Sequence, residues 1–219
     1  MPYTPYDILL ERIVLGDYPP GASLNEQEIA RDLRLSRTPV REAFTRLKLE
    51  GLVKIIPRGG IFVAEASVQK IREITEVRLV LEESLAQRAV EYRTEPLLGE
   101  FRGWLQALEP VWHRLTPKEW MQRDAEFHRF MDRAAANETL ATHLALLRRQ
   151  AVLFWGQSVD GRASLSEIIN DFKQALEALA HRNAEQCGQV LRRHVLDHVE
   201  RIQKYMKPEP IKVAAQEHR

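Results

Sequence analysis

The sequence lacks several features that mark whole classes of protein. It contains a single cysteine, Cys187, in 219 residues, so an intrachain disulfide is excluded. We therefore expect the reducing environment of the cytoplasm. No stretch approaches the roughly 18 consecutive apolar residues of a membrane span, and the N-terminal residues lack the basic and apolar segments of a signal peptide. Internal repeats and zinc-knuckle cysteine pairs are also absent. We expect a globular protein without a membrane partner.

The chain as a whole has no strong excess of charge of either sign, because its formal net charge is +1. The charge is unevenly distributed along the chain, however. Positions 31–58 hold eight basic and three acidic residues, a local excess of five positive charges. Such a patch attracts phosphate groups even when the whole chain is near neutral. This segment is therefore a candidate nucleic-acid-binding surface.

Within that segment, Ser36-Arg37-Thr38-Pro39-Val40-Arg41-Glu42 predicts the start of a helix that continues to about residue 50. Ser36 suits the N-cap because its hydroxyl can accept a hydrogen bond from a free backbone N–H, and Pro39 is tolerated in the first turn. Helical spacing separates an inward face from a polar face. The inward face holds Val40, Ala43, Phe44 and Leu47, and the polar face holds Arg37, Thr38, Arg41, Thr45 and Lys48.

That polar face suits the DNA major groove, because arginine reads guanine edges and holds phosphate, while hydroxyl groups reach either. On its own the pattern is equally typical of a solvated amphipathic helix. The preceding residues favour DNA binding. Helices are predicted over 6–15 and 25–33, and Asn25 and Glu28 have the spacing of a capping box. A helix, a tight turn and a basic helix form a helix-turn-helix.

The residues that follow predict a wing. Gly51 ends the basic helix, and two β-rich runs, 52–56 and 61–63, flank Pro57-Arg58-Gly59-Gly60. At the tip of this hairpin, Arg58 would be attracted to a minor groove, and Gly59 would let the backbone approach phosphate.

Residues 8–64 resemble the winged-helix domain of the GntR family of bacterial transcription regulators. The matching pieces are Pro20-Gly21, Leu24-Asn25-Glu26, Ser36-Arg37-Thr38-Pro39-Val40-Arg41-Glu42, Glu50-Gly51-Leu52-Val53 and Arg58-Gly59-Gly60-Ile61-Phe62-Val63. The resemblance implies that Ser36, Arg37, Thr38, Arg41 and the wing glycine contact DNA. Where the family often has a basic residue in the first motif helix, this chain has Gln27, so one contact is missing or altered.

From residue 70 onward the sequence changes to apolar stripes at helical spacing. They predict helices over 70–93, 96–109, 117–136, 138–156, 164–181 and 183–206, with short turns between them. Short turns imply an antiparallel bundle. We therefore predict a mainly α fold: a winged helix-turn-helix domain at 1–66, an all-α antiparallel helical bundle at 67–207, and a disordered tail at 208–219.

Asp124 and His128 are four residues apart in a predicted helix and share one of its faces, and His194 and His198 have the same spacing later in the chain. Carboxylate and imidazole groups on facing helices form a plausible Zn²⁺, Ni²⁺ or Mn²⁺ site. The alternative without a metal is a surface hydrogen bond between Asp124 and His128.

This half of the chain is similar to the FCD ligand-binding domain that follows the winged helix in one GntR subfamily. The matching pieces are Glu76-Val77-Arg78, Leu81-Glu82, Asp124, Phe127-His128, Ala135-Ala136-Asn137, Leu140 and Leu191-Arg192-Arg193-His194. Many members bind a metal through one aspartate and three histidines, and the resemblance assigns three of these positions to Asp124, His128 and His194. The fourth position is Phe172, which cannot be a ligand.

Two alternatives follow from Phe172. Either three ligands hold the metal and leave positions for water or a carboxylate, or the metal is lost and the pocket binds an organic ligand such as an acyl thioester. Asp171 and His198 are candidate replacement ligands. The resemblance also implies that Arg78 meets the acidic end of the effector, although a salt bridge with Glu82 is an alternative role. Arg148 or Arg149 is a further candidate for the effector pocket.

Together these features predict a ligand-responsive transcription regulator, a repressor that binds a palindromic operator as a homodimer and responds to a small carboxylate. One rival is a metal-dependent, hydrolase-like enzyme built on the bundle. It leaves the winged helix unexplained and lacks a convincing general base, so we expect no enzyme. The other rival is a DNA-binding protein without an effector.

Overall fold

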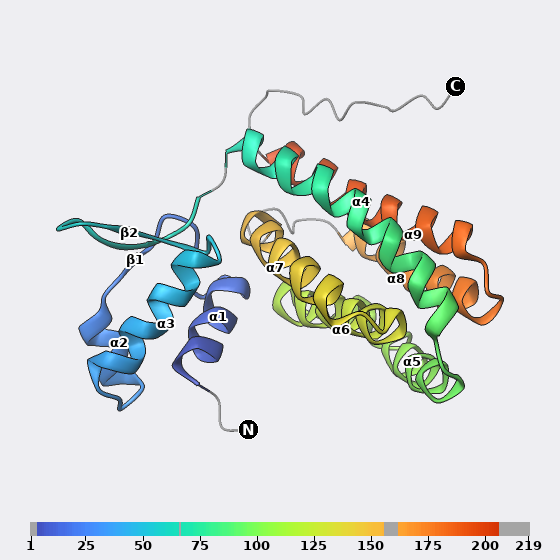
Figure 1. Ribbon diagram of the computed structural model, residues 1–219, viewed down its shortest axis with the longest axis horizontal. Helices are drawn as coiled ribbons and strands as arrows, with labels where there is room; N and C mark the ends of the chain where they lie inside the picture. The colour runs from blue at the N-terminus through green and yellow to red at the C-terminus, as the bar shows by residue number, and fades with distance from the viewer. Residues whose placement is uncertain (1–3, 66, 156–161, 206–219) are drawn as a thin grey trace.

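The chain folds into a winged helix followed by a helical bundle (Figure 1), as seen in a computed structural model that describes residues 4–65, 67–155 and 162–205. The winged helix consists of α1 (Pro5–Val14), β1 (Ser23–Leu24), α2 (Glu26–Asp32), α3 (Arg37–Leu49), β2 (Val53–Ile56) and β3 (Gly60–Val63). The bundle consists of α4 (Val68–Tyr92), α5 (Glu95–Leu108), the short 3₁₀ helix η1 (Trp112–Arg114), α6 (Pro117–Ala135), α7 (Glu138–Trp155), α8 (Arg162–Ala180) and α9 (Ala184–Tyr205). The predicted mainly α fold class is confirmed.

The helices of the winged helix begin where the capping residues predict. The side chain of Asn25 accepts hydrogen bonds from the backbone N–H groups of Gln27 and Glu28 at the start of α2. Ser36 occupies the N-cap position of α3, but its side chain makes no capping hydrogen bond, so the predicted capping role is wrong in this respect. Gly51 has φ +71° just after α3, as expected for the residue that ends a helix.

The wing is a three-stranded antiparallel sheet in the order β1-β3-β2. Ile55 of β2 lies opposite Ile61 of β3, as the predicted hairpin requires. Strand β1 was not predicted, and it pairs Ser23 with Phe62 on the other side of β3. Arg58, at the tip, adopts φ 60°, an uncommon value for a residue with a side chain.

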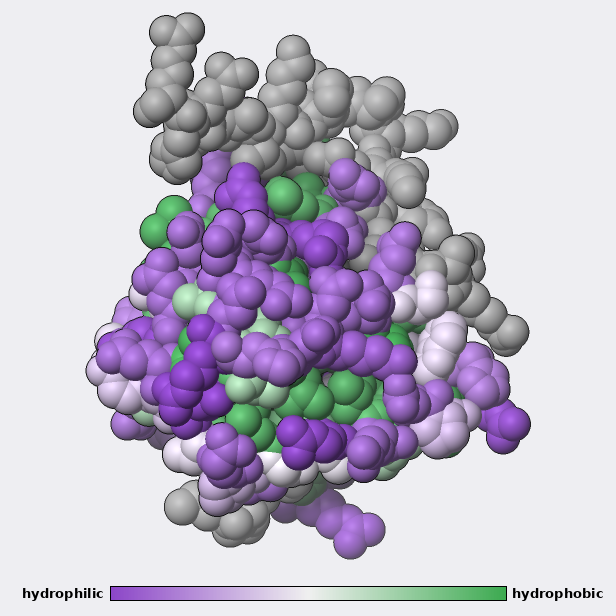
Figure 2. All heavy atoms as spheres, turned by 90° about the vertical axis from the view of Figure 1, so that its right-hand side faces the viewer, coloured by the Kyte–Doolittle hydropathy of each residue, from purple (hydrophilic) through white to green (hydrophobic). Residues whose placement is uncertain are grey.

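The helices of the bundle bury one continuous apolar core. Its largest fully buried side chains are aromatic and come from α5, α6 and α8: Phe101, Trp120, Phe127 and Phe172. Figure 1 shows α4 and α9 running side by side along one side of the bundle. On the face that looks away from the winged helix, hydrophilic residues predominate and hydrophobic ones show between them (Figure 2), as amphipathic helices require.

Several predicted features lie outside the described residues: the tail at 208–219, the break at 159–161 and the side chain of His198. Within the described ranges, no helix is long and apolar enough to cross a membrane.

Candidate metal centre and DNA-binding surface

The residues predicted to contact DNA all lie on the surface of the winged helix. They are Ser36, Arg37, Thr38, Arg41 and Thr45 at or in α3, and Arg58 and Gly59 in the wing. Val40, Ala43, Phe44 and Leu47 occupy the opposite face of α3 and are buried in the core of this domain, as predicted. The polar face of α3 is therefore fixed in place and open to a partner.

Arg41 is engaged by Glu26 at the start of α2. Its Nη2 lies 3.0 Å from Glu26 Oε1 and its Nε lies 3.3 Å from Oε2. The hydrogen bonds and charge of Glu26 raise the pKa of Arg41. Thr45 donates its hydroxyl to the backbone oxygen of Arg41 at 2.9 Å. A DNA phosphate or base would therefore compete with Glu26 for the Arg41 guanidinium.

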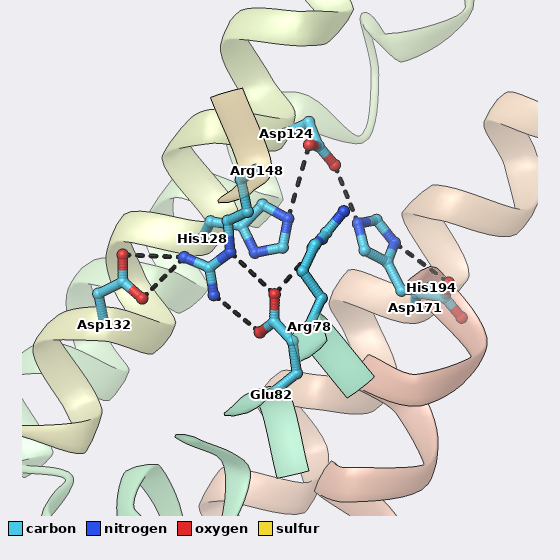
Figure 3. A network of polar contacts seen from close by, with 8 residues as sticks. All are labelled: Arg78, Glu82, Asp124, His128, Asp132, Arg148, Asp171 and His194. Atoms are coloured by element: carbon cyan, nitrogen blue, oxygen red, sulfur yellow. Dashed lines mark hydrogen bonds and ion pairs between the residues drawn. The ribbon is translucent and has the colours of Figure 1, made fainter. Parts of the chain in front are cut away.

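The second site lies inside the bundle, where α6 brings Asp124 and His128 against His194 of α9 (Figure 3). One ligand atom from each of the three residues lies within 4.8 Å of the others. Asp124 Oδ1 is 3.0 Å from His194 Nε2, and Asp124 Oδ2 is 3.6 Å from His128 Nε2. All three side chains are buried. The alternative without a metal, a surface hydrogen bond between Asp124 and His128, is therefore wrong.

The two histidines have opposite electrostatic environments. Burial, followed by the charge of Arg148, holds the pKa of His128 well below its usual range, so this imidazole is neutral. Burial also disfavours the charged form of His194, but the hydrogen bonds that its ring donates to Asp124 and Asp171 outweigh this cost and raise the pKa of His194 to about 9. A neutral His128 is ready to act as a ligand, since metal ions bind the deprotonated imidazole.

Phe172 of α8 closes one side of this cluster. Its ring stacks on Phe127 with centroids 4.4 Å apart, and it is fully buried. The neighbouring Asp171 carboxylate lies 3.4 Å from His194 Nδ1, the nitrogen that faces away from Asp124. Asp171 is therefore placed to orient His194, as a carboxylate behind a metal-bound histidine does. It is not placed to replace the missing ligand.

A network of buried ion pairs adjoins the cluster on the side of α4 and α7 (Figure 3). Glu82 accepts from Arg148 Nε at 2.9 Å and from Arg148 Nη2 at 2.7 Å, and it also lies 3.4 Å from Arg78 Nη2. Arg148 Nη1 donates to both oxygens of Asp132, at 2.8 and 3.0 Å. Burial disfavours charge on Glu82, but Arg148 outweighs it and holds the pKa of Glu82 well below its usual range.

The two predicted effector residues thus differ in their engagement. Arg148 donates from all three of its nitrogens to carboxylates, so its geometry favours positioning Glu82 and Asp132. The contact of Arg78 with Glu82 is longer, 3.4 Å, and is the predicted salt bridge. Among the described residues, Arg78 Nε has no hydrogen-bond partner although it is buried. Arg149 points elsewhere, toward Glu50 of the winged helix.

Asp132 was not singled out from the sequence, although a signal for it existed. It follows Asp124 and His128 at intervals of four in α6, so all three lie on one helix face. Its partner Arg148 is in another helix, and sequence spacing does not specify how two helices face each other. This i, i+4, i+8 run of ionisable residues would have been enough to identify the face of α6 that carries the site.

Comparisons with known proteins match both domains. The profile of the FCD domain matches residues 73–198, and that of the bacterial regulatory proteins of the gntR family matches residues 5–63. The chain is 27% identical to the Nta operon transcriptional regulator of Aminobacter aminovorans over 184 residues, which cover 84% of this chain and 85% of that protein. It is 34% identical to the gluconate operon transcriptional repressor of Bacillus subtilis over 123 residues, 56% of this chain and 50% of that protein.

Solved structures share the same fold. Escherichia coli McbR/YncC superposes with a TM-score of 0.82 at 24% identity, and the match covers 92% of this chain and 96% of that one. A putative GntR regulator from Rhodococcus sp. RHA1 superposes with a TM-score of 0.74 at 23% identity, covering 92% and 97%. The FCD profile alone matches more than half of the chain. The chain therefore belongs to the GntR family of DNA-binding transcription regulators, in the group whose second domain is an FCD domain, and it is not an enzyme.

Proposed function

We propose that the chain is a cytoplasmic, homodimeric repressor whose operator binding responds to a small carboxylate bound beside Asp124, His128 and His194. In this proposal residues 1–66 bind DNA, and residues 67–207 bind the effector and dimerise. The observation that carries it is the cluster of eight ionisable residues drawn in Figure 3, seven of which are buried. Buried charges are costly, and apolar residues would stabilise a purely structural core at least as well. Such clusters are typical of functional sites.

The residues present fit a divalent metal ion. Two imidazoles and a carboxylate are the donor set that Zn²⁺, Ni²⁺ and Mn²⁺ accept, and their ligand atoms converge within 4.8 Å. A metal ion would displace the proton that the raised pKa places on His194, because metals bind the deprotonated imidazole. With both imidazoles then neutral, the four carboxylates Glu82, Asp124, Asp132 and Asp171 face only three arginines, Arg78, Arg148 and Arg193, among the residues that the structure describes around the cluster. This net negative charge favours a cation. A bound metal would supply an open coordination position for a carboxylate.

Arg78 is the residue that we assign to the effector carboxylate. Its guanidinium is buried beside the cluster, and its Nε has no hydrogen-bond partner within the described ranges. An effector carboxylate would satisfy this donor, since a buried donor without a partner is costly. We keep Arg148 as a predicted pocket residue with a positioning role, because Glu82 and Asp132 occupy its nitrogens.

For DNA, we propose that Ser36, Arg37, Thr38, Arg41 and Thr45 enter a major groove, and that Arg58 and Gly59 follow the adjacent backbone. One winged helix reads a short site, so useful specificity requires two copies and a palindromic operator. The name of the gluconate operon repressor supports repression. The effector would favour a dimer geometry that no longer matches the half-site spacing, with a coupling free energy of about 1–3 kcal/mol.

The metal content of the purified protein, measured by elemental mass spectrometry without added chelator, tests the proposed centre. We expect one transition metal per chain in the wild type and in His181→Ala, which changes an exposed histidine. We expect none in His194→Ala. Absence of metal from the wild type would overturn the metal centre and favour the second candidate, an organic ligand held by Arg78 and the aromatic wall around Phe172.

A further inference from the structure

Helix α7 contacts both domains with different faces. Leu144 is buried in the core of the bundle, and Val152 packs against that core. Leu153, on the other face, is buried in the core of the winged helix, although it belongs to a bundle helix by sequence. In return, Leu15 at the end of α1 packs against the core of the bundle. Figure 1 shows α7 as the bundle helix nearest to α1.

Three consecutive residues of α7 make contacts on both sides: Arg148 faces the bundle, and Arg149 and Gln150 face the winged helix. Arg148 is the centre of the buried ion-pair network, held by Glu82 and Asp132. Arg149 Nη2 lies 3.4 Å from Glu50 Oε2, and Gln150 Nε2 donates to the backbone oxygen of Glu50 at 2.7 Å. One helical turn therefore joins the network beside the candidate metal centre to the winged helix.

Glu50 is the point at which the winged helix receives these contacts. It is the C-cap of α3, the helix that carries the predicted DNA contacts. Its carboxylate also accepts from the Tyr6 hydroxyl at 2.7 and 2.8 Å and lies 3.3 Å from Arg46 Nε. The backbone oxygen of a C-cap lacks a partner within its own helix, and Gln150 supplies one.

We propose that α7 couples the two domains: Arg148 senses the buried network, and Arg149 and Gln150 transmit its position to Glu50 and so to the C-terminal end of α3. When the Arg148 guanidinium moves, α7 rotates or shifts with it. Because a helix is stiff over one turn, Arg149 and Gln150 then move by a similar amount. The proposal rests on the proposed function only in taking the network as the effector site.

Hydrogen–deuterium exchange of the full-length protein, read by mass spectrometry, tests this coupling without metal or effector. Gln150→Met removes the contact directly and is expected to raise exchange in the peptide covering residues 46–53. Loss of one hydrogen bond predicts an increase of about fivefold. Arg148→Met is expected to raise exchange in the same peptide, although the hydrogen bonds of Arg148 are to Glu82 and Asp132, which lie outside it. A peptide covering residues 26–32 in α2 should be unchanged.

The matched control is Arg193→Met, which breaks the ion pair with Asp171; the hydrogen bonds of Arg193 are to Asp171 and Gln174, both in α8. It is expected to leave residues 46–53 unchanged. In the double variant Arg148→Met/Gln150→Met the two increases should be less than additive, since the Gln150 contact is one of the two through which the effect of Arg148 passes. Asp132→Asn is a milder change in the network that keeps Arg148 paired with Glu82, and it decides the result if Arg148→Met does not fold.

The coupling would be overturned if Gln150→Met raises exchange at residues 46–53 while Arg148→Met, or Asp132→Asn in its place, leaves it unchanged. It would also be overturned if Arg193→Met has the same effect as Arg148→Met, since the response would then be a general loosening of the bundle. Neither result bears on the metal centre, which the elemental analysis tests separately.

Discussion

The two domains use charged residues in opposite ways. In the winged helix the Arg41–Glu26 pair is at the surface, and the side chain of Arg41 is 68% exposed. In the bundle the Arg148–Glu82 pair is closed off, with side-chain exposures of 8% and 1%. Exposed charges cost little to place and stay available to a charged partner. Buried charges persist only with partners arranged around them. The first pattern suits a large anionic surface such as DNA, and the second suits a small enclosed ligand.

The largest predicted effect concerns the stability of the buried network. Glu82→Gln removes the charge that both Arg78 and Arg148 face, and leaves two buried guanidinium groups poorly compensated. We expect the free energy of unfolding, measured by urea titration, to fall by about 3–5 kcal/mol. The control Glu100→Gln breaks the exposed pair with Arg133 and should change it far less. Equal losses in the two variants would erase the contrast between buried and exposed ion pairs.

The second prediction concerns DNA binding. Arg37→Ala should weaken operator binding by about 5- to 150-fold, the range for loss of a bidentate arginine contact, without changing the unfolding transition. Fluorescence anisotropy would measure it on an operator selected from a pool of random duplexes. Arg133→Ala, which removes an exposed arginine of the bundle, should bind as the wild type does. Unchanged binding by Arg37→Ala would contradict the placement of α3 in the major groove.

The third prediction sharpens the role of Asp171 behind His194. Asp171→Asn should lower Zn²⁺ affinity by about 10- to 100-fold, because the carboxylate that orients a metal-bound histidine is lost. Competition with a chromogenic chelator would measure the affinity. Glu177→Gln changes an exposed carboxylate on the same helix and should have no effect. If Asp171→Asn abolished binding altogether, Asp171 would be a ligand.

The smallest predicted effect is a gain. Glu26→Gln releases Arg41 from its surface ion pair and should strengthen operator binding by up to about fivefold, the range of such pairs. Glu42→Gln removes an exposed acid from α3 itself and serves as the control for a general change in charge. Weaker operator binding by Glu26→Gln would show that the pair with Glu26 holds Arg41 in its DNA-binding position.

The helices could be predicted closely because each carries a local signal. The segment 96–109 differs by one residue at each end from α5, Glu95–Leu108, where Thr94 provides the cap. Elements without periodicity were missed. Strand β1 has two residues and η1 has three, too few to show a repeating pattern, and β1 exists only because β3 offers a free edge.

The candidate site was predictable only where its partners are close in sequence. Asp124 and His128 share a helix face at a spacing of four, so their pairing followed from the sequence. Spacing offered both His194 and His198 as partners on a facing helix, and the family resemblance selected His194. Arg148 and Glu82 are 66 positions apart, and their contact depends on how α4 and α7 are rotated. Apolar stripes fix that rotation only approximately, so the buried network had to be seen in the structure.

A calorimetric titration of Zn²⁺ into Arg37→Ala and His128→Ala, prepared side by side, tests the separation of the two sites most directly. The account predicts that Arg37→Ala binds one Zn²⁺ per chain with wild-type affinity, because Arg37 is exposed in the other domain. His128→Ala should show no saturable binding at this site. Identical titrations for the two variants would contradict the assignment of the buried cluster as the ligand-sensing centre.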